Sequence, residues 1–412
     1  MQSSTERPPL LQSGTPTFRR MNLALFAAGF STFATLYCVQ PLLPVFSHEF
    51  GVGAAASSLS LSLTTGLLAG SMLVAGSLSD MWGRKPVMVA SLVSSAVLTV
   101  VSAALPNWTA LLAARALVGI TLSGLPAVAM TYVSEEVHPK SVGLAMGLFI
   151  GGNAVGGMAG RLLTGMLTDL GGWRFAMAAI GTLGLLAAAG AWASLPAPAQ
   201  TRHRPADFMG LLRSFAEPLR DPGLCGLFAE GFLLMGAFVT LYNYLGFRLL
   251  APPYGFSQTA IGAIFVVYLV GTASSAWIGD LAGRLGRRKV LWSMIATMAL
   301  GVGLTLSDAI APILIGIAVV TFGFFGAHSI ASSWVGRRSH SARAQSSALY
   351  LFCYYAGSSI VGTVGGVFWT AHSWRGVVGL VLALLTAAFA VSLWLATVPP
   401  VAPGPPEPTA GS

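Results

Sequence analysis

Twelve apolar stretches, each long enough to cross a lipid bilayer, follow one another along this chain of 412 residues. A membrane-spanning helix needs about 20 mostly apolar residues. Because 55% of the residues are hydrophobic and only 8% are charged, the chain cannot cover itself with a water-soluble surface. We therefore predict an all-α polytopic membrane protein with twelve transmembrane helices. They begin near residues 21, 58, 86, 108, 141, 174, 223, 259, 290, 312, 345 and 376.

A short motif between apolar stretches occurs twice. The first copy is at residues 76–85, and a less complete copy follows 203 residues later at 279–288. The pair Trp173-Arg174 similarly returns as Trp374-Arg375. Such repeats in one orientation are common in secondary transporters and predict two six-helix bundles related by a parallel pseudo-repeat. The expected parts are a cytoplasmic tail at 1–20, bundles at 21–195 and 223–397, a cytoplasmic linker at 196–222 and a disordered cytoplasmic tail at 398–412.

The placement of basic residues explains the net charge of +9. In the twelve-helix topology, the side that holds both termini carries 17 Lys and Arg residues, and the opposite side carries 3. This imbalance follows the positive-inside rule. We therefore expect cytoplasmic termini in a bacterial inner membrane, with the lipid bilayer as a partner and no nucleic acid.

The sequence lacks the signals that are characteristic of several other classes of protein. The three cysteines form no Cys-x-x-Cys pair, and no paired carboxylates or His/Glu metal motif are visible. We expect no metal, no cofactor and no enzyme activity. A channel would need repeated filter elements, which are also missing. A nontransporting membrane sensor remains an alternative function, although the sequence shows no soluble signalling domain.

The first loop copy resembles the signature of the major facilitator superfamily between its second and third helices. The matching residues are Gly76, Asp80, Gly83, Arg84 and Lys85. The resemblance covers residues 20 to 397 and implies alternating access, with this loop as a cytoplasmic gate. Arg84 and Lys85 are also explained as topology anchors alone. The second copy departs from the pattern, since Gly283 takes the place of Asp80.

Glycines in the fifth span resemble the antiporter signature of the same superfamily. They are Gly143, Gly152, Gly156, Gly157 and Gly160, with Gly157 where the family has proline. The resemblance implies export of solute in exchange for protons. Glycine at every fourth position also permits any close helix crossing, so a packing role remains open.

Three ionisable residues within the spans are candidates for proton coupling. Arg115 and Gly119 resemble the family's Arg-x-x-x-Gly element, which assists proton transfer, and Arg115 lies about 10 Å below the outer surface. Glu230 lies about 12 Å from the inner surface, where desolvation favours a neutral carboxyl group. His328 titrates near neutral pH in its ordinary state. An ion pair for Glu230 and simple packing for His328 are the alternatives.

Polar and aromatic side chains near the middle of the spans are candidates for substrate contacts. They are Tyr37, Gln40, Asn153, Tyr242, Asn243, Tyr244, Tyr354 and Tyr355. Pro41 and Pro44 should bend the first span. Arg161 lies about 30 Å along the fifth helix, and its side chain either snorkels to the outer interface or has a functional role.

These features together predict a monomeric transporter that couples protons to the efflux of a small organic solute, either a drug-like amphipath or a sugar. An uptake symporter is the alternative within the same class, because sequence patterns do not separate the two directions of coupling.

Overall fold

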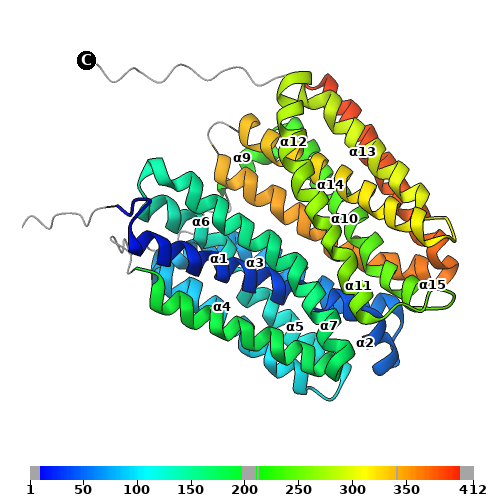
Figure 1. The fold of residues 1–412 in the computed structure, drawn as a ribbon. Helices are drawn as coiled ribbons and strands as arrows, with labels where there is room; N and C mark the ends of the chain where they lie inside the picture. Colours follow the sequence, from blue (N-terminus) through cyan, green and yellow to red (C-terminus); the bar gives the residue numbers. More distant parts are fainter. Residues whose placement is uncertain (1–9, 197–209, 211–212, 340–341, 400–412) are drawn as a thin grey trace, which may run out of the picture. The chain divides into compact units, whose positions relative to one another are not determined.

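The computed structural model describes residues 10–196, 210, 213–339 and 342–399, and every regular element in them is a helix (Figure 1). The first half of the chain contains α1 Pro16–Tyr37, η1 Gln40–Leu42, α2 Leu43–Glu49, α3 Ala54–Trp82, α4 Arg84–Ala104, α5 Trp108–Leu122, α6 Gly124–Glu136 and α7 Pro139–Ser194. The second half contains α9 Ala216–Leu219, α10 Pro222–Leu250, α11 Gln258–Ile264, η2 Phe265–Val267, α12 Tyr268–Leu285, α13 Arg287–Leu304, α14 Ile310–Arg338 and α15 Arg343–Thr397.

Nine helical segments within the described residues are long and apolar enough to cross a membrane. Two of them, α7 and α15, are pairs of spans broken at Gly172 (φ 79°) and at Ser373 (φ 52°), so the nine segments supply eleven spans. The twelfth is α13, whose first turn carries three consecutive basic residues that lower its apolar character. The prediction of an all-α, twelve-helix polytopic protein is confirmed.

Local chemistry explains where the first span begins and bends. The Thr15 side chain accepts a hydrogen bond from the Phe18 backbone N–H (3.2 Å), so α1 begins at Pro16, inside the predicted tail. The helix ends at Tyr37, and the chain continues through η1, with Pro41, into α2, with Pro44. Proline cannot donate the hydrogen bond that a continuous helix requires, which accounts for the predicted bend.

The described chain packs as two units. Unit 1 contains the described residues of 1–207, 239–268 and 358–377, and unit 2 contains those of 208–238, 269–357 and 378–412. Segments 239–268 and 358–377 come from the second half of the sequence, yet they pack with the first half. The domain boundaries drawn from the sequence therefore stay a prediction, and residues 197–209 of the linker and 400–412 of the tail lie outside the described part.

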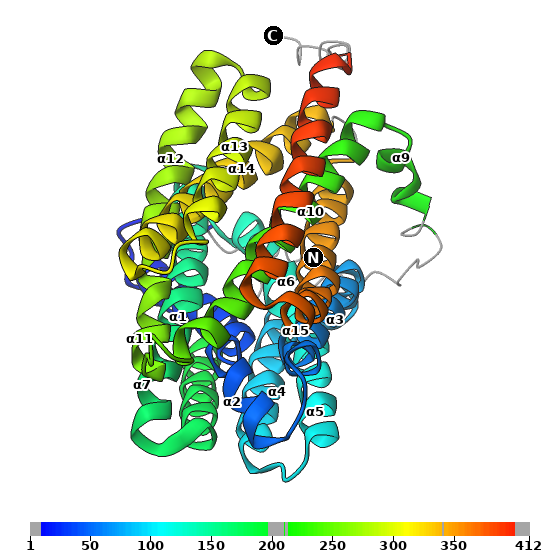
Figure 2. The same cartoon turned by 90° about the vertical axis from the view of Figure 1, so that its right-hand side faces the viewer.

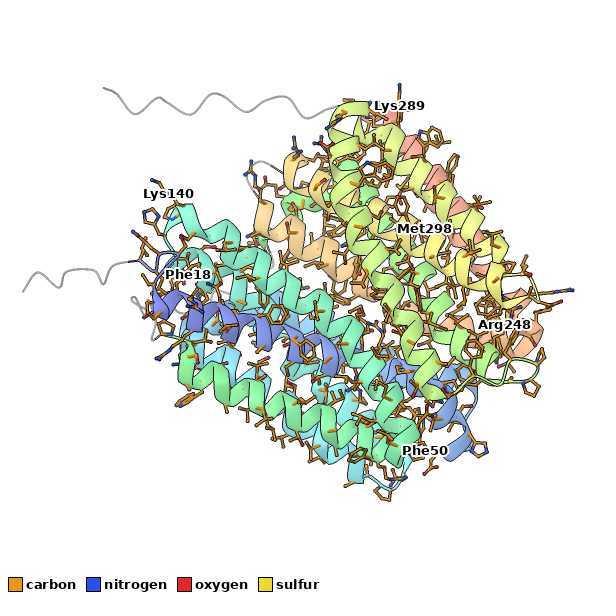
Figure 3. The ribbon with its side chains drawn as sticks, in the orientation of Figure 1. Phe18, Phe50, Lys140, Arg248, Lys289 and Met298 are labelled. Atoms are coloured by element: carbon orange, nitrogen blue, oxygen red, sulfur yellow. The ribbon has the colours of Figure 1, made fainter. Side chains whose placement is uncertain are left out.

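In unit 1, α1 packs along α7, and residues such as Met21, Leu25 and Tyr132 form a fully buried core. Phe18 and Lys140 lie at one end of this unit, and Phe50 and Arg248 lie at the opposite end (Figure 3). Phe50 belongs to a cluster of rings with Phe46, Trp108 and Trp173, with ring centroids 5.2 to 6.2 Å apart. Phe46 and Trp173 are buried, so the cluster packs the helices together at this end of the unit.

Glycines bring α7 into backbone contact with α1. A Cβ atom at Gly156 would overlap the Phe30 carbonyl oxygen, and Gly152 and Gly160 meet Phe26 and Ala34 in the same way. Gly143, in contrast, has open space around its Cα. Three of the five antiporter-type glycines thus serve close helix packing, which the sequence left as an alternative.

We expect Gly156→Ala to lower the thermal stability of the protein clearly, because the added methyl group forces α1 and α7 apart. Gly143→Ala is the matched control on the same helix and should leave the unfolding temperature unchanged or slightly higher. Unfolding in detergent, followed by light scattering or intrinsic fluorescence, measures both. Equal unfolding temperatures for the two variants would contradict this role of Gly156.

Candidate functional site

Glu230 lies in α10 within unit 2 and is completely buried. Neither of its carboxylate oxygens has a hydrogen-bond partner in the described part of the chain. A buried carboxylate without partners is strongly disfavoured in its charged form. The site therefore suits a carboxyl group that gains a proton or meets a partner from outside the protein, and the alternative of a bonded arginine finds no support here.

His328 in α14 and Tyr350 in α15 are hydrogen-bonded to each other in the same unit. The distance from His328 Nδ1 to the Tyr350 hydroxyl is 2.8 Å, and either atom acts as donor depending on the imidazole tautomer. Tyr350 also faces α10, since a Cβ atom at Gly231, next to Glu230, would lie 3.0 Å from its ring. Tyr350 thus hydrogen-bonds one predicted coupling residue and packs against the helix that carries the other.

The sequence did not single out Tyr350, although a signal was present. Tyr350 precedes the predicted contact residue Tyr354 by four positions, so the two share one helix face. Tyr354 packs against His328 with ring centroids 4.7 Å apart, and Tyr355 meets Tyr354 edge to face at 5.2 Å. Both predicted tyrosines of the eleventh span therefore lie in the surroundings of His328 in unit 2.

Arg115 in α5 is fully buried in unit 1 and binds main-chain carbonyl groups. Its guanidinium donates to Thr35 (3.3 Å), Leu36 (3.0 Å) and Ser60 (3.2 Å). The first two carbonyls lie at the end of α1, where the bend leaves them without a backbone donor, and the Thr35 carbonyl also accepts a hydrogen bond from the Cys38 thiol at 3.3 Å. Arg115 therefore holds the bend in the first span, and the described contacts do not connect it with a carboxylate.

Arg161 in α7 is only 2% exposed, so the interpretation that it snorkels to the interface is wrong. Its guanidinium carbon lies 3.9 Å from the ring centre of Tyr37, 4.7 Å from that of Phe265 and 5.1 Å from that of Tyr268. Its Nε donates to Gln40 Oε1 at 2.6 Å. A cation so enclosed is stabilised by the negative faces of the rings.

The remaining candidates for substrate contact in unit 1 differ in what they contact. Gln40 donates to Asn243 Oδ1 at 2.8 Å, which connects α10 with the surroundings of Arg161. Tyr244 donates to the Gly362 carbonyl at 2.7 Å, and Tyr242 stacks on Phe265 at 5.1 Å. Asn153 Oδ1 is buried without a hydrogen-bond partner among the described residues.

The first loop copy forms a network of ion pairs at the end of α3. Arg84 pairs with Asp80 at 2.6 Å and, through two nitrogens, with Glu135 of α6 at 3.0 and 3.2 Å. Gly83 precedes α4 with φ 92°, a conformation that favours glycine, and Lys85 donates to the Leu195 carbonyl. Arg84 thus has specific partners, and Glu135 is a member that the sequence did not reveal.

Gly76 and the second copy of the motif make fewer contacts. Gly76 contributes its carbonyl, which accepts a hydrogen bond from Ser79 at 2.7 Å. In the second copy, Asp280 and Arg284 form an ion pair at 2.8 Å, but their side chains are 59% and 75% exposed. Exposed pairs contribute little to stability, so the second copy has lost most of the network of the first.

Comparison with known proteins gives a consistent result for both halves of the chain. A family model described as Major Facilitator Superfamily matches residues 25–251 and again residues 245–411. The Bacillus subtilis protein YybF, an uncharacterized MFS-type transporter, is 47% identical over 386 residues, which are 94% of this chain and 96% of that protein. The Escherichia coli inner membrane transport protein YnfM is 48% identical over 393 residues, which are 95% of this chain and 94% of YnfM.

A solved structure agrees in fold. The crystal structure of a bacterial homologue of the human lysosomal transporter Spinster, in an inward-facing and occupied conformation, superposes with a TM-score of 0.76. The match covers 93% of this chain and 98% of that one at 15% sequence identity. At this identity the comparison establishes the architecture alone.

Proposed function

Because this chain belongs to the major facilitator superfamily and is a multi-pass membrane transporter rather than an enzyme, we propose that it exports a small organic solute in exchange for protons. The observation that carries this proposal is the buried carboxyl group of Glu230, which has no hydrogen-bond partner among the described residues. Intramembrane acidic groups of this kind mark proton or ion pathways. The location of YnfM and the positive-inside pattern support an inner-membrane site with cytoplasmic termini.

In the proposed cycle, Glu230 carries the proton. His328 is partly exposed, and its hydrogen bond to Tyr350, whose ring packs against Gly231 beside Glu230, supplies a polar route toward the buried carboxyl group. Tyr350 exchanges protons in either direction because its hydroxyl both donates and accepts. Neutralising Glu230 removes the cost of a bare buried charge, and that change in free energy biases one conformation over the other.

The other predicted site residues take separate roles in this proposal. Asp80, Arg84 and Lys85, with Gly76 and Gly83, form the cytoplasmic gate, and Glu135 positions Arg84. Arg115 acts indirectly by holding the bend of the first span. The solute, a drug-like amphipath or a sugar, contacts the polar and aromatic set that includes Asn153, Asn243 and Tyr354. The transporter works as a monomer with protons and the solute as partners.

Purified protein in liposomes with an acidic lumen tests the direction of coupling. An antiporter accumulates solute in the acidic lumen while the lumen becomes more alkaline, whichever way the protein is inserted. Cationic dyes and sugars are the two solute classes to screen. Accumulation that instead requires an alkaline lumen, with protons entering together with the solute, would overturn export and establish an uptake symporter.

We expect Tyr350→Phe to slow proton-coupled transport by about tenfold or more, because the hydroxyl next to His328 is lost while the ring packing stays. Tyr132→Phe is a matched control, since it also removes one hydroxyl hydrogen bond of a buried tyrosine, to the Pro196 carbonyl, but in unit 1. Proton flux in liposomes measures both. Equal rates in the two variants would remove Tyr350 from the proton route.

A further inference from the structure

We propose that Arg161, Gly165 and Asp169 form the seam that closes the transport pathway on the noncytoplasmic side, a role that rests on the proposed alternating access. The three residues are spaced four apart on α7, so they lie on one face of the helix. We call them the α7 stripe. Each contacts residues 258–268, which form α11, η2 and the start of α12. Figure 2 shows α11 beside α7, and all these residues belong to unit 1.

At the outer level, Asp169 binds the beginning of α11. Its Oδ2 accepts hydrogen bonds from the Thr259 backbone N–H at 2.7 Å and from the Thr259 hydroxyl at 2.6 Å. Its Oδ1 accepts one from the Gln258 N–H at 3.2 Å. One carboxylate from the first half of the sequence therefore receives three donors from the second half. Hydrogen bonds to a charged acceptor are the stronger kind.

At the middle level, the backbones of α7 and α11 touch. A Cβ atom at Gly165 would overlap the Gln258 carbonyl oxygen, and one at Gly262 would lie 2.9 Å from the Arg161 carbonyl oxygen. Neither helix can carry a side chain at this crossing without moving away from the other. The glycines at 165 and 262 thus make the contact tight enough to exclude water.

At the inner level, the Arg161 guanidinium is enclosed from both halves of the sequence. Tyr37 and Gln40 come from the first half, and Phe265 and Tyr268 come from the second. Among the described residues, its hydrogen bonds go to the neutral oxygens of Gln40 and Gly157 rather than to an acidic side chain. Two of the three rings that stabilise the charge, those of Phe265 and Tyr268, therefore leave it when the second-half segment moves.

These three levels give the seam two discrete states. When it is closed, the guanidinium is held by rings, the backbones exclude water and Asp169 is bound by three donors. When α11 and η2 move away, all three sets of contacts are lost together, and water replaces them at Arg161 and Asp169. Contacts that form and break as a unit favour a switch between two positions over gradual opening.

A reversible cross-link tests whether the seam must open. In a chain with Cys38, Cys225 and Cys353 replaced by serine, Asp169→Cys and Thr259→Cys place two thiols where the side chains now touch. Bridging them with a short bifunctional thiosulfonate should stop transport, and a reductant should restore it. The two single-cysteine variants, treated in the same way, are the controls. Full transport by the cross-linked protein would overturn the proposal.

A labelling experiment tests the seam without any knowledge of the solute. Ile264→Cys in the same cysteine-free chain places a reporter thiol in α11 at a position that is 7% exposed. Adding Gly165→Ala or Arg161→Gln should raise its reaction rate with a membrane-impermeant maleimide, applied from the noncytoplasmic side, by about tenfold. That factor corresponds to about 1.4 kcal/mol of lost closure energy.

Gly151→Ala is the matched control, because this glycine lies on the same helix with open space around it, and its labelling rate should be unchanged. Unchanged rates in all three variants, in protein that remains folded, would overturn the seam. Labelling requires neither solute nor protons. If the Gly165→Ala and Arg161→Gln variants are labelled faster, but the cysteine-free protein without these substitutions does not exchange protons, proton-coupled export is refuted and the seam is supported.

Discussion

Replacing Glu230 by glutamine should abolish proton-coupled transport while leaving membrane insertion and folding intact. Glutamine has nearly the same volume as glutamate and stays neutral at every pH, so it mimics the protonated carboxyl group permanently. The wild-type carboxyl group is completely buried and has no hydrogen-bond partner among the described residues, so its ionisation changes the free energy of the site strongly. A neutral amide removes that change, and with it the bias that protons exert on the conformation.

Proton flux driven by an imposed pH gradient measures this loss in liposomes, and thermal unfolding in detergent confirms that the protein is folded. Glu49→Gln is the matched control. It changes the same functional group at an exposed position, where Glu49 pairs with Arg174 at 2.7 Å, and should leave proton flux unchanged. Full coupling in the Glu230→Gln variant would show that the proton is carried elsewhere.

Replacing Arg115 by methionine should have the second large effect, which we expect on stability. The substitution leaves the carbonyl groups of Thr35, Leu36 and Ser60 without the donor that they share. The Leu36 carbonyl then loses its side-chain donor, whereas the Thr35 and Ser60 carbonyls keep the Cys38 thiol (3.3 Å) and the Thr64 hydroxyl (3.1 Å). A buried acceptor left unsatisfied costs about 1–3 kcal/mol, so we expect a loss of that size. A lower unfolding temperature and a low yield of folded protein are the measurable results.

Arg174→Met is the control for this experiment, because the Arg174 side chain is 46% exposed and its ion pair contributes little. The comparison also separates two roles of Arg115. If Arg115→Met keeps normal stability but loses proton flux, then Arg115 acts directly in proton transfer, as the resemblance of its Arg-x-x-x-Gly element implies. Loss of stability alone supports its role in holding the first bend.

The twelve helices could be predicted because their cause is local. Lipid offers no hydrogen-bond partners, so each apolar stretch has to form its own backbone hydrogen bonds as a helix. The break in the first span follows in the same way from Pro41, and Gly172 allows α7 to turn between two spans at φ 79°. These features depend on residues that are neighbours in the sequence.

The partners of buried charges could not be predicted, because they come from distant parts of the chain. Arg84 binds Glu135, 51 residues away, and Arg161 binds Gln40, 121 residues away. The position of Arg161 along its helix suggested that the side chain reaches the membrane interface. That position does not show which other helices cover the side chain. The glycines of α7 show the same limit, since one spacing fits both an antiporter signature and a close contact with α1.

By itself, the sequence determined that this protein is a twelve-helix membrane transporter built from two related halves, since hydropathy and repetition act along the chain. The tertiary structure decided that Tyr350 binds His328 and packs against α10 at Gly231, that Arg115 holds carbonyl groups, and that the α7 stripe meets residues 258–268. The physical reason is that the role of a buried polar group depends on the side chains and backbone groups that surround it. Those surroundings exist only after distant helices have packed together.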